Sequence, residues 1–415
     1  MYPIKICFLT PFPPKEDGVA EYSRCLVDSL QNKGTTIFVV TQNMARKSTS
    51  EKPSFERNVR IFEIWNPKSI INQFKIFRQI LGMHPNIVHI QYGPYSGYGG
   101  LLGEPLFLLL VLLKLSRLCC IVTLHSIWLP QEVTSRVYEK LKSTFLSKLA
   151  SIYYYFFMKI FLKSCNLVLV CVNFNRSAIA KQIIELFGLP NSKVHQIVHG
   201  SANPISLQQK LKAKEKLGVK GKILLCTGFV RPDKGYEYAI EALDSLKKKN
   251  MQLKLIIAGT PNTMEGWNYL SSLKKQGKKL HLSGDVIFDT RYLPEKDLLD
   301  YFASSDLLLL PYSRRVGPSG PLAIAASSGL PTIMTVDPKF ALSNVSPFVK
   351  LVPPKNSKAL ASMIEKMFDD DQTMEKMVNE ALAFSSKYSF DEVARQHILL
   401  YSSMLTNEAG FPRNF

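Results

Sequence analysis

The chain has 415 residues, of which 46% are hydrophobic and 20% charged, and its formal net charge is +19. This composition excludes a disordered, a collagen-like or a coiled-coil protein, and the length predicts two or three domains, each with its own core. The basic excess is larger in residues 1–204 than in the rest of the chain, and it indicates an anionic partner: nucleic acid, a lipid surface or an acidic small molecule.

Nucleic acid is the weakest of these partners, because the sequence contains no zinc-finger spacing, no RNP-like aromatic stretch and no dense basic arm. The longest charge-free apolar run, 105–113, is shorter than the roughly 18–20 residues that cross a bilayer. The N-terminus leads directly into a strand-like segment, and the seven cysteines form no metal-spaced pair with histidines. We therefore expect a cytoplasmic protein with reduced thiols.

In the first half, short apolar segments alternate with longer helical patterns. The predicted strands are 4–10, 36–41, 87–91, 120–124, 167–172 and 194–198. The predicted helices are 19–31, 70–81, 101–116 and 176–187. Because the strands are continuously apolar, the alternation indicates βαβ units on a parallel sheet that is covered on both faces.

A polar segment at 199–204 and a lysine-rich stretch at 207–220 interrupt this pattern before a second series begins. Its predicted strands are 222–227, 253–258, 286–288, 307–310 and 332–334. Its predicted helices are 236–248, 295–304, 321–328, 357–368, 371–384 and 391–405. The pattern predicts an α/β protein with two doubly wound domains, 1–204 and 205–388, and a ligand crevice at the carboxyl edges of their strands.

The second domain opens with a motif suited to phosphate. Residues 228–235 read Gly-Phe-Val-Arg-Pro-Asp-Lys-Gly and stand between a predicted strand and a predicted helix. Gly228 permits a sharp exit from the strand, while Arg231 and Lys234 lie close to the helix N-terminus. Two cations and free backbone N–H groups suit a diphosphate. The alternative is a solvated loop with two unpaired cations.

This Gly-x-x-Arg-x-x-Lys-Gly stretch resembles the donor-diphosphate motif of retaining glycosyltransferases of family 4, also called glycosyl transferases group 1. Other features follow in the family's order: residues 10–20 after the first strand, His125 after a later strand, 199–200 before the linker, and 306–311 before a Gly-Pro-rich helix start. The resemblance spans nearly the whole chain. It implies the GT-B fold, with a Rossmann-like acceptor domain, a Rossmann-like donor domain, and a last helix within 389–415 that packs back on the first domain.

The resemblance implies two site residues in the first domain. Gly18 stands where the family's first loop approaches the sugar diphosphate through glycine backbone, although Val19 replaces the second glycine of many relatives. The alternative for Gly18 is an ordinary turn at a helix start. His125 matches the family's histidine beside the transferred sugar, where a neutral imidazole can donate to a hydroxyl; a structural histidine is the alternative. His199 is expected to pack between other side chains.

Residues 316–331 depart from the family's pattern. Relatives usually carry two glutamates here, one for the sugar and one for the ribose, and the matching positions are Val316 and Ile324. Neither side chain can bond a hydroxyl. The helix start between them is retained and is expected to hold phosphate, unless it is a purely structural N-cap. Its residues are Ser319, Gly320, Pro321 and Leu322.

Arg291 and Tyr292 match the place where the family's nucleotide base stacks or bonds to backbone, without revealing which base. The acidic run 369–371 is expected to complement a helix dipole rather than to bind a metal. We expect no cofactor and no metal, because fixed cations and helix termini neutralise the leaving diphosphate in a GT-B site.

Two segments of the first domain concern the acceptor. Residues 91–100 form a glycine- and tyrosine-rich segment suited to sugar stacking or lid motion, or an ordinary loop. Residues 136–163 mix lysines with aromatic residues at helical length. That mixture fits a helix at a membrane interface, or a core helix with snorkelling lysines.

The sequence therefore predicts a metal-independent, retaining hexosyltransferase of polysaccharide or glycolipid biosynthesis. It would move a sugar from a nucleotide-diphosphate sugar to a glycan or lipid-linked acceptor, with Arg231 and Lys234 on the leaving diphosphate and His125 beside the sugar. It would act in the cytoplasm, in peripheral contact with the inner face of the membrane and without nucleic acid. Two alternatives are a catalytically silent GT-B binding protein, favoured by the missing glutamates, and a sugar-nucleotide epimerase.

Overall fold

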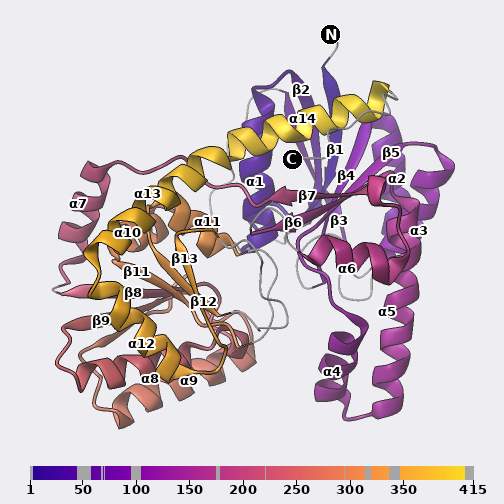
Figure 1. Ribbon diagram of the computed structural model, residues 1–415. Helices are drawn as coiled ribbons and strands as arrows, with labels where there is room; N and C mark the ends of the chain where they lie inside the picture. Colours follow the sequence, from indigo (N-terminus) through magenta and orange to yellow (C-terminus); the bar gives the residue numbers. More distant parts are fainter. Residues whose placement is uncertain are drawn as a thin grey trace. The chain divides into compact units, whose positions relative to one another are not determined.

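The protein is described here from a computed structural model (Figure 1), which covers residues 3–43, 58–66, 69, 71–94, 104–173, 178–219, 221–293, 295–313, 319–335 and 346–406. The chain divides into two compact units. Unit 1 comprises Met1–Gly200 and Phe390–Phe415, and unit 2 comprises Ser201–Ser389. The chain thus leaves unit 1 slightly before the expected domain end at residue 204.

Unit 1 contains a parallel seven-stranded sheet with the strand order β3-β2-β1-β4-β5-β6-β7. The strands are β1 (Ile4–Leu9), β2 (Thr35–Gln42), β3 (Val59–Trp65), β4 (Ile87–Tyr92), β5 (Cys119–Leu124), β6 (Leu167–Val172) and β7 (Val194–Val198). The sequence did not predict β3. It is an edge strand whose residues are mostly half-buried, so it lacks the continuous apolar run that marks the central strands.

Seven α-helices are described in unit 1. They are α1 (Gly18–Gln31), α2 (Asn72–Met83), α3 (Glu104–Leu115), α4 (Pro130–Leu141), α5 (Thr144–Ser164), α6 (Ala178–Phe187) and α14 (Phe390–Thr406). The predicted helical segment 136–163 is therefore not continuous. Lys142 ends α4 in the left-handed region with φ 53°, and the Ser143 hydroxyl caps α5 by accepting from the Leu146 N–H at 3.3 Å.

The C-terminal helix α14, drawn in yellow in Figure 1, belongs to the core of unit 1. Val393, Ala394 and Tyr401 are fully buried in one cluster with residues of β1 and α1. Such burial of apolar surface contributes about 25 cal/mol per Å² to stability. The last helix therefore stabilises the core of unit 1, although it follows unit 2 in the sequence.

Unit 2 contains a parallel six-stranded sheet with the order β10-β9-β8-β11-β12-β13. The strands are β8 (Lys222–Thr227), β9 (Leu253–Ala258), β10 (Val286–Asp289), β11 (Leu307–Leu310), β12 (Thr332–Thr335) and β13 (Val349–Val352). Both sheets start at a central strand, run to one edge and then reverse, which is the doubly wound order. The predicted fold class, α/β with two Rossmann-like domains, is confirmed.

The described α-helices of unit 2 are α7 (Leu207–Leu217), α8 (Tyr236–Lys247), α9 (Met264–Lys279), α10 (Glu295–Ser304), α11 (Gly320–Ser327), α12 (Ser357–Phe368) and α13 (Asp371–Lys387). Helix α9 was missed from the sequence. It is rich in lysine and buries only a few residues, so its apolar stripe is too narrow to stand out. Strand β13 was missed because it is short and lies at the sheet edge.

The two points where the chain passes between the units are tightly held. Within unit 2, the Ser201 N–H donates to the Tyr388 carbonyl oxygen at 2.9 Å. Within unit 1, Gly200 lies so close to Phe390 that an added Cβ would stand 2.6 Å from the ring. The chain therefore leaves and re-enters unit 1 at two residues in contact, Gly200 and Phe390. It likewise enters and leaves unit 2 close to two bonded residues, Ser201 and Tyr388.

Candidate functional site

Two loops at the carboxyl edge of the unit 2 sheet are bonded to each other. They follow β8 and β11, which are adjacent strands. The Ser313 N–H donates to the Asp233 carbonyl oxygen at 3.0 Å, and the Ser313 hydroxyl donates to the Pro232 carbonyl oxygen at 2.9 Å. Gly235 has φ 65°, and a Cβ there would collide with the Pro311 carbonyl oxygen. Only glycine permits this close approach of the two loops.

Arg231 is not an unpaired cation, contrary to the expected alternative of a solvated loop. Its Nη2 donates to Asp233 Oδ2 at 3.1 Å, and its Nε lies 3.0 Å from Asp233 Oδ1. Both side chains are half-buried. The carboxylate therefore orients the guanidinium at the loop and offsets part of its charge.

Lys234 is a desolvated cation beside Gly228. Burial lowers the pKa of its ammonium to about 8, an effect that Asp233 opposes and Arg231 reinforces. Gly228 has φ 114°, and its missing Cβ would lie 3.9 Å from Lys234 Nζ. An anion that enters next to Gly228 would restore the favourable environment that the ammonium lacks.

Two tyrosines that the sequence analysis did not identify surround this lysine. Lys234 Nζ lies 4.5 Å from the centroid of the Tyr312 ring, within cation–π range. The Tyr236 hydroxyl would lie 3.8 Å from a Cβ on Gly228; it is buried and has no hydrogen-bond partner among the residues that the structure describes. No sequence signal marked either residue, because each owes its position to the pairing of β8 with β11 and to the first turn of α8.

The start of α11 joins the same cluster through Tyr312. The hydroxyls of Tyr312 and Ser319 lie 2.9 Å apart, and Ser319 caps the helix. The Leu322 N–H is already bonded to the Ser319 carbonyl at 3.1 Å, and Pro321 has no N–H. No described heavy atom lies within 4 Å of a Cβ placed on Gly320. Among the described atoms, none therefore occupies the side-chain face of Gly320 at this helix start.

Arg291 and Tyr292 lie beyond the carboxyl end of β10, the edge strand of the same sheet. Arg291 forks onto Asp289 with N···O distances of 2.9 and 2.6 Å, and the Tyr301 hydroxyl donates to Asp289 at 2.8 Å. These hydrogen bonds lower the pKa of the Asp289 carboxyl, and the bond from Arg291 has the largest effect. Both Arg291 and Tyr292 are exposed at this edge.

In unit 1, Gly18 begins α1 and is preceded by a strong cap. The Asp17 carboxylate accepts from the N–H groups of Val19 at 2.8 Å and Ala20 at 3.4 Å. No described heavy atom lies within 4 Å of a Cβ placed on Gly18. The backbone at Gly18 is thus both ordered by the cap and open on its side-chain face.

His125 follows β5 directly and is buried among polar and aromatic side chains. Its Nε2 lies 2.7 Å from Gln91 Oε1, and its ring meets Tyr22 edge-on at 4.6 Å. Burial, with smaller contributions from His199 and His397, lowers the pKa of His125 to about 3. The imidazole is therefore neutral at physiological pH, as expected. His199 packs against Tyr22 in the same cluster.

The segment 91–100 is only partly described. Gln91 and Tyr92 belong to β4 and are fully buried, so this part is not the flexible loop that was expected. Residues 95–100 lie outside the described residues, as does Val316. Ile324, the other position that matches a family glutamate, is half-buried on α11.

Both halves of the chain match models of known glycosyltransferases. The model of glycosyl transferases group 1 matches residues 208–384, and that of glycosyltransferase family 4 matches residues 17–200. The chain belongs to the group 1 glycosyltransferase family. The expected family is thereby confirmed across both units.

A curated relative of this glycosyltransferase is mannosylfructose-phosphate synthase from Agrobacterium fabrum, which is 29% identical over 181 residues. The match covers 42% of this chain and 38% of that protein. Among solved structures, sucrose-phosphate synthase from Thermosynechococcus elongatus gives a TM-score of 0.73 at 15% identity, covering 98% of this chain and all of that one. The Anabaena protein HepE in complex with UDP gives 0.69 at 16%, covering 96% and 100%. At such identities these structures establish the fold, GT-B.

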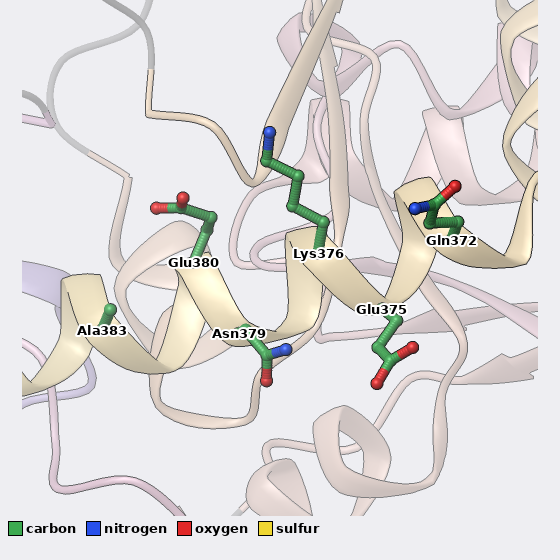
Figure 2. A pocket seen from close by; sticks show the side chains of 6 residues that line it. All are labelled: Gln372, Glu375, Lys376, Asn379, Glu380 and Ala383. Carbon is green, nitrogen blue, oxygen red and sulfur yellow. The ribbon is translucent and has the colours of Figure 1, made fainter.

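One surface hollow of the glycosyltransferase lies away from the predicted site. Its lining residues in Figure 2 all come from α13: Gln372, Glu375, Lys376, Asn379, Glu380 and Ala383. None of the predicted site residues lines it. In the described part of the chain, no group of three or more His, Cys, Asp or Glu side chains is placed to hold a metal ion.

Proposed function

We propose that this glycosyltransferase is a retaining hexosyltransferase that moves a sugar from a nucleoside-diphosphate sugar to a glycan or lipid-linked acceptor. The observation that carries the proposal is the desolvated ammonium of Lys234 beside the bare backbone of Gly228. A desolvated cation with a lowered pKa is poised for an anionic ligand. The stretch that contains it is also the one that resembles the family's diphosphate motif.

The chemical role of this cluster is to stabilise the leaving group. As the bond between the anomeric carbon and the diphosphate breaks, negative charge grows on the departing phosphate. The acceptor hydroxyl oxygen bonds to the anomeric carbon, and its proton passes to the departing phosphate. Lys234, Arg231 and the backbone N–H of Gly320 at the start of α11 are the proposed donors at one edge of a sheet. Fixed donors of this kind are each worth about 3 kcal/mol in a transition state. We expect no metal or cofactor requirement on this basis.

The base of the donor follows from neither the loops nor the resemblance. HepE has been solved with UDP-glucose, in a match of 18% identity. We therefore take UDP and UDP-glucose as the first ligands to test, with Arg291 and Tyr292 as the nearest candidates for contact with the base. A screen of nucleoside diphosphates and their sugars would also identify the donor sugar that this protein uses.

A membrane surface is the proposed acceptor environment, and α5 carries this part of the proposal. Figure 1 shows α4 and α5 together, extending from the sheet of unit 1. Among the described helices, α5 alone is long and apolar enough to cross a membrane, which corrects the expectation that no such segment exists. It is anchored in unit 1 by buried Tyr154, Phe157 and Phe161, so we propose contact rather than crossing.

The outer face of α5 has the chemistry of an interfacial helix. It exposes large apolar side chains, namely Phe145, Leu146, Leu149, Ile152, Tyr153, Phe156 and Ile160. Its sequence contains three lysines and no acidic residue, and Lys148 and Lys163 are exposed. Exposed apolar area together with positive charge favours an anionic lipid bilayer. We propose that the protein acts in the cytoplasm and that α5 contacts the inner face of the membrane.

The decisive test of transfer is a thermal-shift screen of nucleoside diphosphates and their sugars, followed by an assay with the stabilising donor and lipid or glycan extracts. Lys234→Ala should lose at least a hundredfold in activity while keeping its fold. Unchanged turnover in that variant would refute the mechanism. Conversion of the donor without acceptor would indicate the epimerase instead.

A catalytically silent binding protein remains the second candidate, because Ile324 is apolar where relatives carry a glutamate. It predicts nucleotide binding without release of a nucleoside diphosphate with any acceptor.

For the proposed membrane contact, liposome flotation with anionic lipid should show salt-sensitive binding that is lost in Phe145→Ser/Phe156→Ser. The matched control is Met264→Ser/Trp267→Ser, which removes exposed apolar residues from α9 in unit 2. Equal loss in both pairs would contradict docking through α5.

A further inference from the structure

We propose that Gln91, His89 and Tyr401 form a buried relay that fixes which ring nitrogen of His125 carries the proton, and so positions His125 for the sugar. This role rests on the proposed function, because His125 matters there as the group beside the transferred sugar. The relay itself is a property of unit 1. It makes positioning residues of His89 and Tyr401, which had no expected role, and of Gln91, which was expected in an acceptor loop.

The first link defines the state of His125. Its Nε2 lies 2.7 Å from Gln91 Oε1. An amide oxygen only accepts, so Nε2 of His125 must carry the hydrogen. Among the described residues, the other ring nitrogen, Nδ1, has no hydrogen-bond partner. His125 therefore presents Nδ1 as an acceptor, whereas the sequence had suggested a donor.

The next links define the state of His89. The Gln91 amide nitrogen, a donor, lies 3.4 Å from His89 Nε2, and the Thr123 hydroxyl lies 2.7 Å from the same nitrogen. Because an amide nitrogen can only donate, His89 Nε2 is the unprotonated acceptor, so the Thr123 hydroxyl also donates to it and Nδ1 carries the hydrogen. His89 Nδ1 then donates to the Tyr401 hydroxyl, 2.6 Å away. The orientation of each group thus follows from its neighbour.

Burial makes this arrangement persistent. His89, Gln91, Thr123 and Tyr401 are all fully buried. The pKa of His89 is held well below its ordinary value by burial first, and by His397 and His125 next, so no proton from solvent reverses the links. An amide that turned over while both histidines kept their tautomers would present a donor to the Nε2–H of His125 and leave buried groups unsatisfied, which is costly, so all the links can reverse only together.

The relay depends on the return of the chain to unit 1. Tyr401 lies on α14, and His89, Gln91 and Thr123 lie on the adjacent strands β4 and β5. Another residue of α14, His397, packs its ring 5.6 Å from that of His89. The C-terminal helix therefore supplies the last acceptor of the relay as well as apolar packing.

The direct test reads the protonated nitrogen without any need for activity. In full-length protein labelled with nitrogen-15 at histidine, His125 is assigned by its loss in His125→Asn. We expect the Nε2–H form in the native protein and a mixture of both forms in Gln91→Leu. Gln73→Leu, which replaces another fully buried glutamine of unit 1, is the matched control and should leave His125 unchanged. A native Nδ1–H form, or no change in Gln91→Leu, would overturn the relay.

A kinetic test separates positioning from binding. Gln91→Leu and Tyr401→Phe should lower kcat by about tenfold to a hundredfold, by analogy with the range found when the partner that orients a metal-bound imidazole is removed, with KM for the donor nearly unchanged. Tyr154→Phe controls for loss of a buried hydroxyl elsewhere in unit 1. An unchanged kcat in both relay variants would refute the positioning role. If the protein transfers no sugar at all, the proposed function fails, and the nitrogen-15 spectrum still decides the relay.

Discussion

The ammonium of Lys234 lies 4.5 Å from the centroid of the Tyr312 ring, and the hydroxyl of the same tyrosine lies 2.9 Å from that of Ser319. One side chain thus connects the cation of the loop after β8 with the cap of α11. Such a cation–π contact is worth about 0.5–2 kcal/mol. Tyr312 therefore sets the spacing between two elements that we propose to hold the same diphosphate.

Replacement of Tyr312 should separate its two contacts. Tyr312→Phe keeps the ring and loses only the bond to Ser319, about 1 kcal/mol, so nucleotide affinity should fall by no more than about fivefold. Tyr312→Leu also loses the cation–π contact, so its nucleotide affinity should fall about tenfold or more. Titration calorimetry with the nucleoside diphosphate found in the screen measures both. Equal affinities in the two variants would exclude a role for the ring.

The affinity for that nucleotide should depend on pH through Lys234. In the free protein the pKa of Lys234 is about 8, so above this pH the ammonium is mostly neutral and must take up a proton to bind an anion. We expect the dissociation constant to rise up to about tenfold per pH unit above pH 8. Calorimetry in buffers of different ionisation enthalpy should register the proton uptake.

The control for this pH dependence is Lys234→Arg, which stays charged over the whole range. Its dissociation constant should stay flat from pH 7.5 to 9.5 apart from ionisation of the ligand, which is common to both proteins. A native protein that is as flat as this variant would show that the Lys234 ammonium does not bind the nucleotide.

Stability should respond to the contact between Gly200 and Phe390. In Gly200→Ala the new Cβ stands 2.6 Å from the Phe390 ring, and overpacking of this kind costs about 1–3 kcal/mol. Gly277→Ala on α9, where no described heavy atom lies within 4 Å, should instead gain about 0.5–1 kcal/mol. Denaturant unfolding followed by circular dichroism measures both. Phe390→Leu should partly rescue Gly200→Ala; if it does not, the clash with the ring is not the cause.

The position of the missing ribose contact can be tested by adding one. Ile324→Glu places a carboxylate on the half-buried face of α11 where the family's second glutamate is expected. A charged hydrogen bond is worth about 1.5–3 kcal/mol, so nucleoside diphosphate should bind at least tenfold tighter. The 2′,3′-dideoxy analogue should gain nothing. A gain for both ligands, or for neither, would show that residue 324 does not face the ribose.

Much of the fold was predictable because buried parallel strands are locally apolar. Strand β8 and helix α8 were recognised almost to the residue, whereas the edge strands β3 and β13 were not, since an edge strand needs no continuous apolar run.

The polar residues His89 and Gln91 alternate within a predicted buried strand. That anomaly was the available signal for a buried network, because polar groups in a core need partners.

Both Rossmann-like units could be predicted from the sequence, as could the positions of Arg231 and Lys234 after β8 and of His125 after β5. These follow from local patterns: apolar runs, glycines at turns and cations before a helix. Three contacts could be seen only in the folded chain: Asp233 pairs with Arg231, Tyr312 covers Lys234, and Tyr401 reaches His89. The last two depend on which strands and helices become neighbours, and the pairing of Arg231 depends on how the loop closes. Strand order and side-chain direction arise from packing the whole core at once, which no local pattern encodes.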